Sequence, residues 1–296
     1  MPPRLPHQTN RWVWIILVTI LVLFLLGRLV NLSGGDDGFG VGEKVGVLRI
    51  EGAIYASRQI VEDLDELARR SDVKALVVRI DSPGGVVAPS QEIYEKVRRV
   101  RAEKPVVISM GSVAASGGYY IALGGSRIVA NRGTITGSIG VIMEYPVAVE
   151  LLDKLGLSIE TVKSGKLKDS GSPTRSPTDA DRRYFQNVVN ELHQQFVSAV
   201  ALERNLDLDS VRELADGSVF TGTQSLNLGL IDTLGTYEDA VSIAAELGGI
   251  KGKPKTVRIR HRRPTLMEMI LGEREPVGSS WFDSIPAYRW RGKIND

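Results

Sequence analysis

The residues best suited to chemistry are a serine and its small neighbours, in the segment from Gly111 to Tyr120. An apolar, β-branched run precedes this segment and a short apolar run follows it, which predicts a strand, a sharp turn and a helix start. Small residues let the chain turn sharply, and the first N–H groups of the helix point at the turn. Ser116 at that junction suits a nucleophile whose attack produces an oxyanion. The alternative is that these small residues only allow strand and helix to pack closely.

A second glycine-rich turn, Asp81 to Gly85, follows another apolar run, residues 73–80. In a parallel sheet both turns fall at the carboxyl ends of strands, where sites collect. A backbone N–H of Gly84 or Gly85 can then reach the same oxyanion as the Ser116 and Gly117 turn. The alternative here is an ordinary Pro-Gly turn.

A serine hydroxyl needs an adjacent base, and the chain has only three histidines. His7 and His261 lie near the ends of the chain and His193 lies in an amphipathic helix, so a Ser-His-Asp triad lacks candidates. A lysine is the other suitable base when its pKa falls from about 10.4 toward 7. The loop with Lys166 and Lys168 is the natural source, although the residues themselves do not choose between the two. A pair of solvated charges is the alternative.

The elements around these turns alternate between strands and helices. We expect strands at 44–50, 73–80 and 105–109, a helix between the first two and another at 89–102. This alternation predicts an α/β fold with a parallel sheet and crossover helices.

Further strands are expected at 126–130, 138–143 and 158–162. A helix is expected near 149–155, and a capping box at Thr178–Asp181 should open a long amphipathic helix. Its expected buried face comprises Phe185, Val188, Val189, Leu192, Phe196 and Val200. Shorter helices are expected at 207–214 and 237–247.

The run from Trp12 to Leu32 has one charge, Arg28, and is long enough to cross a hydrocarbon core of about 30 Å. A cleaved signal peptide is the alternative, but no A-x-A-like site follows the run. Basic residues before the run place the N-terminus in the cytoplasm and the rest of the chain outside.

Composition excludes several classes of function. A net charge of +2 gives no reason to expect a nucleic-acid partner, and the absence of Cys excludes disulfides and a thiol nucleophile. The sequence contains no nucleotide fingerprint and no cluster of metal ligands, so we expect neither cofactor nor metal.

Four motifs in order resemble the bacterial signal peptide peptidase A family of serine–lysine membrane proteases. They are Asp-Ser-Pro-Gly-Gly at 81–85, Ala-Ala-Ser-Gly-Gly-Tyr-Tyr at 114–120, Ile-Thr-Gly-Ser-Ile-Gly-Val at 135–141 and Ser-Gly-Lys-Leu-Lys-Asp at 164–169. The resemblance implies the crotonase-like α/β spiral shared with Clp proteases. It also implies the short, single-copy form, which assembles into a homo-oligomer.

The resemblance also assigns roles. Ser116 matches the family's nucleophile, Lys168 its general base and Ser138 a hydroxyl that helps hold the lysine. Gly84 or Gly85 would donate to the oxyanion beside Gly117. Substrates would be extended, largely apolar peptides such as signal-peptide remnants. Residues 171–175 depart from the bulkier residues usual after the Lys-Asp pair.

The resemblance completes the expected domain organisation. We expect a cytoplasmic N-terminus at 1–11, a single transmembrane anchor at 12–32, a flexible linker at 33–43, a protease domain at 44–250 and a basic C-terminal segment at 251–296. Two other functions fit parts of the pattern: a non-catalytic membrane scaffold, and an acyl-CoA enzyme of the same fold.

Overall fold

The computed structural model describes residues 14–22, 42–259 and 287–289. The chain divides into two units, residues 1–42 and 43–296. In the first unit, residues 14–22 form a helix, while residues 12–13 and 23–32 of the expected membrane span lie outside the described residues. None of the helices described is both long and apolar enough to cross a membrane.

The second unit is built on an eight-stranded sheet with the order β7-β6-β4-β2-β1-β9, in which β5 pairs with β4 and β8 with β5. Its strands are β1 (Lys44–Glu51), β2 (Val73–Ser82), β4 (Val106–Ala115), β5 (Arg127–Ala130), β6 (Ile135–Gly137), β7 (Val219–Thr221), β8 (Thr233–Leu234) and β9 (Lys255–Arg258). All pairs are parallel except β6 with β7. The predicted parallel sheet is therefore confirmed.

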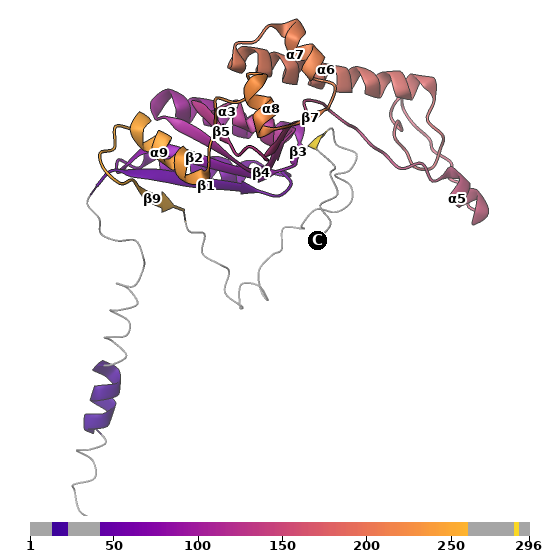
Figure 1. Ribbon diagram of the computed structural model, residues 1–296. Coiled ribbons are helices and arrows are strands. Elements are labelled where there is room, and N and C mark those ends of the chain that lie inside the picture. Colours follow the sequence, from indigo (N-terminus) through magenta and orange to yellow (C-terminus); the bar gives the residue numbers. More distant parts are fainter. Residues whose placement is uncertain (1–13, 23–41, 260–286, 290–296) are drawn as a thin grey trace, which may run out of the picture. The chain divides into compact units, whose positions relative to one another are not determined.

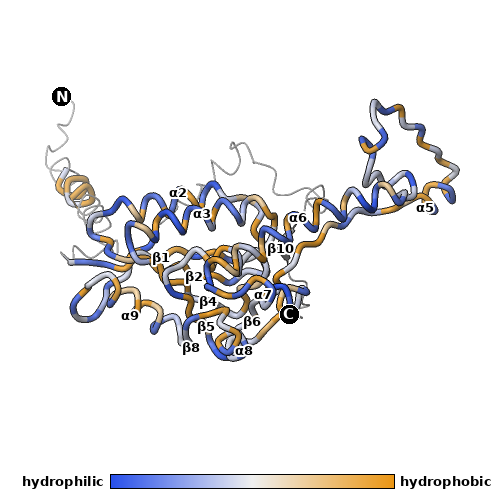
Figure 2. The backbone as a smooth tube through the Cα atoms, turned by 90° about the horizontal axis from the view of Figure 1, so that it is seen from above, coloured by the Kyte–Doolittle hydropathy of each residue, from blue (hydrophilic) through white to orange (hydrophobic). Residues whose placement is uncertain are grey.

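Helices cover both faces of this sheet (Figures 1 and 2). The helices described in this unit are α2 (Arg58–Arg69), α3 (Val87–Glu103), α4 (Gly117–Ala122), α5 (Val149–Lys154), α6 (Asp179–Arg204), α7 (Leu208–Leu214), α8 (Gly222–Asn227) and α9 (Tyr237–Leu247), of which α5 lies away from the sheet. Side chains alternate across a strand, so Leu76 and Val78 of β2 join the core beneath α2 and α3, whereas Val77 packs with Ala244 of α9.

A small second sheet pairs β3 (Gly84–Val86) with β10 (Ala287–Arg289) in antiparallel register, with Tyr288 opposite Gly85. The other edge of β3 meets Ile54 in an isolated bridge. The turn predicted after β2 thus leads directly into a short strand that has a neighbour on each edge.

Two predicted strands are wrong. The strand expected at 138–143 is instead β6, which ends at Gly137, because Ser138 has φ +50° and turns the chain away from the ladder. Residues 158–162 form no strand, because they are exposed and pair with no neighbouring strand among the described residues. The helix near 149–155 is confirmed as α5, and the capping box is confirmed at the start of α6.

Residues 141–178, which we call the arm, extend from the sheet beyond the N-terminal end of α6 and include α5 (Figures 1 and 2). The predicted buried face of α6 is correct only for its C-terminal half. Phe196 and Val200 are buried in the core, whereas Phe185, Val188 and Val189 remain partly exposed. The first half of α6 therefore supports the arm and does not cover the sheet.

Candidate active site

Ser116 lies between the end of β4 and the start of α4, in a backbone conformation that residues other than glycine rarely adopt. Its φ and ψ are 54° and −117°. The Ser116 N–H donates to Gly137 O at 2.8 Å, and its carbonyl accepts from Tyr120 N at 2.8 Å. The side chain is 1% exposed, and its Oγ has no hydrogen-bond partner in the described part of the chain. A strained strand-to-helix turn with an unpaired hydroxyl is the geometry of a nucleophile elbow.

Glycines bring the two glycine-rich turns together. A Cβ on Gly118 would lie 2.9 Å from Ser82 O, and one on Gly111 would lie 2.5 Å from Asp81 Oδ2. The Asp81 carboxylate also accepts from Val113 N at 3.1 Å. Any larger residue at Gly111 or Gly118 would separate β4 and α4 from the end of β2.

Gly84 and Gly85 differ in what their peptide groups contact. Gly84 has φ +98°, and its N–H donates to Ser82 Oγ at 3.1 Å. Gly84 O and Val86 N bind Ile54, so the peptide group of Gly85 faces the opposite edge of β3, where β10 lies. Gly85 also has no room for a Cβ, which would lie 2.0 Å from Ile54 O. Of the two candidate oxyanion donors, Gly85 has its N–H on the edge that receives a strand.

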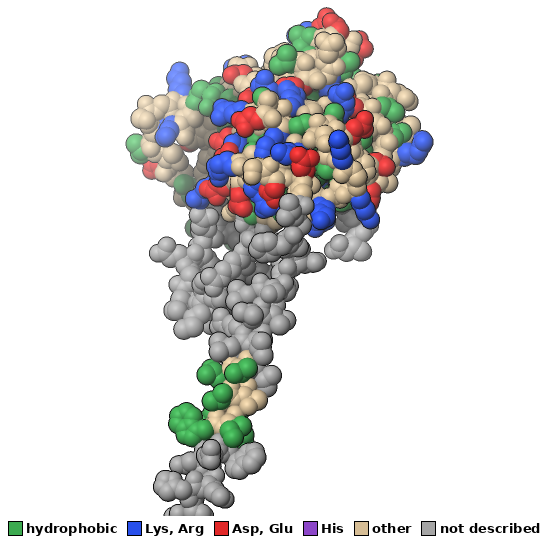
Figure 3. Space-filling model, turned by 90° about the vertical axis from the view of Figure 1, so that its left-hand side faces the viewer, with side chains coloured by type: hydrophobic (Ala, Val, Ile, Leu, Met, Phe, Trp, Pro, Cys, Tyr) green, Lys and Arg blue, Asp and Glu red, His purple; other side chains and the backbone are tan. Residues whose placement is uncertain are grey.

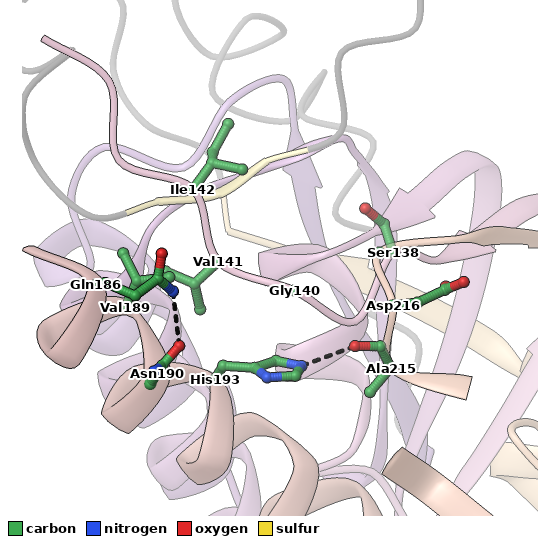
Figure 4. Close-up of a pocket in the computed structure, with 11 residues that line it drawn as sticks. Ser138, Gly140, Val141, Ile142, Gln186, Val189, Asn190, His193, Ala215 and Asp216 are labelled. Atoms are coloured by element: carbon green, nitrogen blue, oxygen red, sulfur yellow. Dashed lines mark hydrogen bonds between the residues drawn. The ribbon is translucent and has the colours of Figure 1, made fainter. Parts of the chain in front are cut away.

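Ser138 borders a pocket formed by the chain after β6, one side of α6 and the turn before β7 (Figure 4). Ser138 is 7% exposed, and its N–H donates to Ser218 O at 2.7 Å. The other residues that line the pocket are Gly140, Val141, Ile142, Gln186, Val189, Asn190, His193, Ala215, Asp216 and Gly217. His193 Nε2 donates to Ala215 O at 2.8 Å, which gives this histidine a structural role.

Lys168 lies in the arm and is exposed, as is Lys166. The Lys168 backbone is held by a hydrogen bond from its N–H to Gly165 O at 3.2 Å. The next residue, Asp169, is 11% exposed at its side chain and pairs with Lys163 and Arg175. Among the described residues, no cluster of His, Cys, Asp and Glu could hold a metal ion.

One chain does not bring Ser116 and Lys168 together. The turn that bears Lys168 is bonded to Asp181 at the start of α6, through Ser170. The core near Ser116 meets the same helix at Phe196, whose ring lies 4.9 Å from that of Tyr120. Phe196 lies fifteen positions after Asp181 along the helix, a rise of about 22 Å. Figure 1 shows the arm extending away from the sheet.

Comparison with known families gives this geometry its context. The family model for peptidase family S49 matches residues 98–251, which is more than half of the chain. The chain belongs to peptidase family S49. The model for Clp protease matches residues 48–139, which include the second half of β1, β2 to β6 and both glycine-rich turns. The α/β fold described above is consistent with a Clp-protease-like arrangement.

Similar individual proteins are consistent with this family. A protein of Synechocystis sp. is 45% identical over 209 residues, which cover 70% of this chain and 76% of the relative. The chloroplastic serine protease SPPA of Arabidopsis thaliana is 32% identical over 261 residues, covering 85% of this chain and 38% of the relative. Protease 4 of Haemophilus influenzae is 31% identical over 231 residues, covering 74% and 37% respectively.

The protein is therefore a serine peptidase, a hydrolase of peptide bonds, and the resemblance to the signal peptide peptidase A family is confirmed. The S49 match includes Ser116, Ser138 and Lys168. Sequence reasoning missed the contacts of Arg175, because one arginine in a polar loop gives no pattern. The capping box at Thr178 and Asp181 was the only local signal of order there.

Proposed function

We propose that this S49 peptidase works through a serine–lysine dyad in which Ser116 of one copy meets Lys168 of a second copy. The observation that carries this proposal is the separation of the two side chains. The Ser116 hydroxyl is buried in the sheet-bearing part of the molecule with no hydrogen-bond partner among the described residues, whereas Lys168 is exposed on the arm. A second copy that receives the arm would place the amine beside the hydroxyl.

The apolar surface of the arm supports assembly of several copies. Large apolar side chains on the arm are exposed by more than half: Val147, Leu151, Leu155, Leu157, Ile159 and Val162. A monomer gains nothing from exposing such a group of side chains to water. Because the arm of one copy would reach the body of the next, the contact would be head to tail, and we propose that the rotation between copies closes it into a ring.

In the proposed reaction, the neutral Lys168 amine removes the proton of Ser116 Oγ, and Oγ attacks the carbonyl carbon of a peptide bond. The resulting tetrahedral oxyanion accepts hydrogen bonds from the N–H groups of Gly85 and Gly117. The lysine ammonium then gives its proton to the leaving amine. Water, deprotonated by the same amine, hydrolyses the acyl-enzyme. Ser138, next to the β6 end that binds Ser116 N, would hold the amine with its hydroxyl.

The substrates we propose are extended, largely apolar peptides such as signal-peptide remnants. An extended peptide that takes the place of β10, which pairs with the edge of β3 in the antiparallel sense, can bind that edge by main-chain hydrogen bonds. Residues 12–32 would anchor the protein in the cell membrane by a single span. With the N-terminus cytoplasmic, the peptidase domain lies outside and beside peptides released into the bilayer.

Complementation between two inactive variants tests the shared dyad. We would co-express full-length Ser116→Ala with Lys168→Ala and assay purified assemblies on a fluorogenic apolar peptide. In a ring of randomly mixed copies, about one site in four combines an intact serine with an intact lysine from the neighbour. We therefore expect about a quarter of the wild-type activity, although each variant is inactive by itself.

A mixture as inactive as its parents, with mixed assemblies confirmed by mass spectrometry, would contradict a dyad shared between copies. A wild-type protein that does not cleave peptides and is not acylated at Ser116 by an active-site serine probe would contradict the proposed peptidase mechanism as a whole.

A further inference from the structure

The turn that bears Lys168 is held by an arginine. Arg175 Nε donates to Asp169 Oδ2 at 2.8 Å and Nη2 donates to Asp169 Oδ1 at 2.9 Å. The same guanidinium donates to Asp181 through Nη1 at 2.6 Å and Nη2 at 3.0 Å. Arg175 thus joins the residue next to Lys168 to the first turn of α6.

Asp181 is a firm anchor for this contact. It is 1% exposed and accepts further hydrogen bonds from Thr178 N, Thr178 Oγ1 and Ser170 Oγ. The helix that it begins runs into the core, where Phe196 and Val200 are fully buried. A rigid path therefore connects the core, α6, Asp181, Arg175 and the Asp169 backbone, which directly follows Lys168.

We propose that Arg175 is a positioning residue for catalysis, which fixes the Lys168 turn so that its amine reaches Ser116 of the adjoining copy. This inference rests on the proposed function. Arg175 itself does not touch the substrate or the reacting atoms. It acts through Asp169 and the backbone of the turn.

The chemistry of the contact favours arginine at this position. A planar guanidinium can engage two carboxylates at once in fixed directions, whereas a lysine ammonium cannot reproduce that fork. Hydrogen bonds from Arg175 lower the pKa values of Asp169 and Asp181 well below their usual range, and Asp181 and Asp169 in turn raise the pKa of the guanidinium. All three groups therefore remain charged throughout the neutral range.

The same contact keeps the Asp169 carboxylate occupied. Both of its oxygens bind Arg175, and Oδ1 also binds Lys163 Nζ at 2.6 Å. A freed carboxylate would attract the neighbouring Lys168 ammonium and favour its protonated form. Arg175 thus keeps the Asp169 carboxylate from attracting the Lys168 amine, in addition to fixing the backbone of the turn.

The test places Arg175→Gln in one or the other partner of the complementation pair, in full-length protein. We expect the variant to reduce the recovered kcat by roughly 10- to 100-fold when it is on the copy that supplies the lysine, Ser116→Ala. On the copy that supplies the serine, Lys168→Ala, it should leave the recovered activity within about twofold. In an otherwise wild-type chain, Arg175→Gln should lower kcat with little change in KM, and Arg175→Lys should rescue only part of the loss.

Arg182→Gln is the matched control, because Arg182 is exposed in the same first turn of α6. It should leave recovery unchanged on either copy. Equal losses from Arg175→Gln on both copies would overturn the inference, since a merely structural role does not distinguish them. No loss on either copy would overturn it as well. If the parent pair recovers nothing, the shared dyad fails first, and this inference fails with it.

Discussion

The arm and the rest of the second unit, which we call the body, differ in where they place apolar and charged side chains. In the body, Ser116 is enclosed by a parallel sheet and two glycine-rich turns, and every element there packs on a neighbour within the chain. The body face in Figure 3 carries Lys and Arg interspersed with Asp and Glu. On the arm, large apolar side chains face outward and Lys168 stands exposed.

The difference shows which half of the site is complete in one chain. The candidate nucleophile and the candidate oxyanion donors are built by local turns and strand ends, so a single copy forms them. The lysine depends on a segment whose apolar surface has no cover within the described chain. Under the proposed function, a preorganised body and an arm that needs a second copy would make activity depend on assembly.

The largest expected effect is on the chemistry itself. Ser116→Ala and Lys168→Ala should each lower kcat by at least about 10³-fold, because each removes a group that the proposed mechanism uses for proton transfer or attack. Hydrolysis of a fluorogenic peptide by full-length protein in detergent measures this loss.

Lys166→Ala provides the matched control, two residues from Lys168 on the same exposed loop. It should retain nearly full activity. An inactive Lys166→Ala beside an active Lys168→Ala would show that the base has been assigned to the wrong lysine.

The next effect concerns stability and separates body from arm. Phe196→Ala should reduce the free energy of unfolding by about 3–5 kcal/mol, because the ring is fully buried against Tyr119 and Tyr120. Leu151→Ala on the arm, where the side chain is 59% exposed, should change it by less than about 0.5 kcal/mol. Urea denaturation of dilute protein measures the free energy of unfolding of both variants. Similar decreases for the two would indicate that the arm is part of the core.

Assembly should depend on the arm and not on the body. Leu155→Glu places a charge on the apolar surface of the arm, where the leucine is 62% exposed. We expect smaller particles by light scattering and a matching loss of activity, with the unfolding midpoint of the body unchanged. Leu247→Glu in α9 is the control from the body, since Leu247 is also exposed. If both variants assemble like wild type, the arm is not the contact surface.

The smallest effect is a dependence of arm order on pH. The pKa values of Asp169 and Asp181 are lowered by Arg175, so the stabilisation is complete above their unfolded pKa of about 4 and is lost as pH falls through the lower folded values. Hydrogen exchange of residues 164–178, corrected for intrinsic rate, should be constant from pH 7 to 5 and increase only below about pH 4. A rise already near pH 6 would contradict this assignment.

Much of the body could be predicted from local pattern. Apolar runs gave β1, β2 and β4, and the Thr178–Asp181 spacing gave the start of α6, because these signals depend on residues close in sequence. The prediction of a strand at 158–162 is wrong. Its apolar residues suggest burial, but a strand needs a neighbouring strand to pair with, and the arm has none among the described residues. The strand predicted at 138–143 lies a few residues after the observed β6, because Ser138 adopts a positive φ that no local sequence pattern indicated.

The sequence by itself determined the chemistry available to this protein: a serine between small residues, glycine turns at strand ends and a lysine in a polar loop, all of which are local properties of residue type and spacing. Only the tertiary structure decided where these groups lie. It buried the Ser116 hydroxyl, turned the peptide group of Gly85 toward the edge of β3 that pairs with β10, and joined the Lys168 turn to α6 through Arg175. The physical reason is that burial, strand pairing and ion pairing are long-range contacts, fixed by how distant segments pack and not by the order of residues within any one of them.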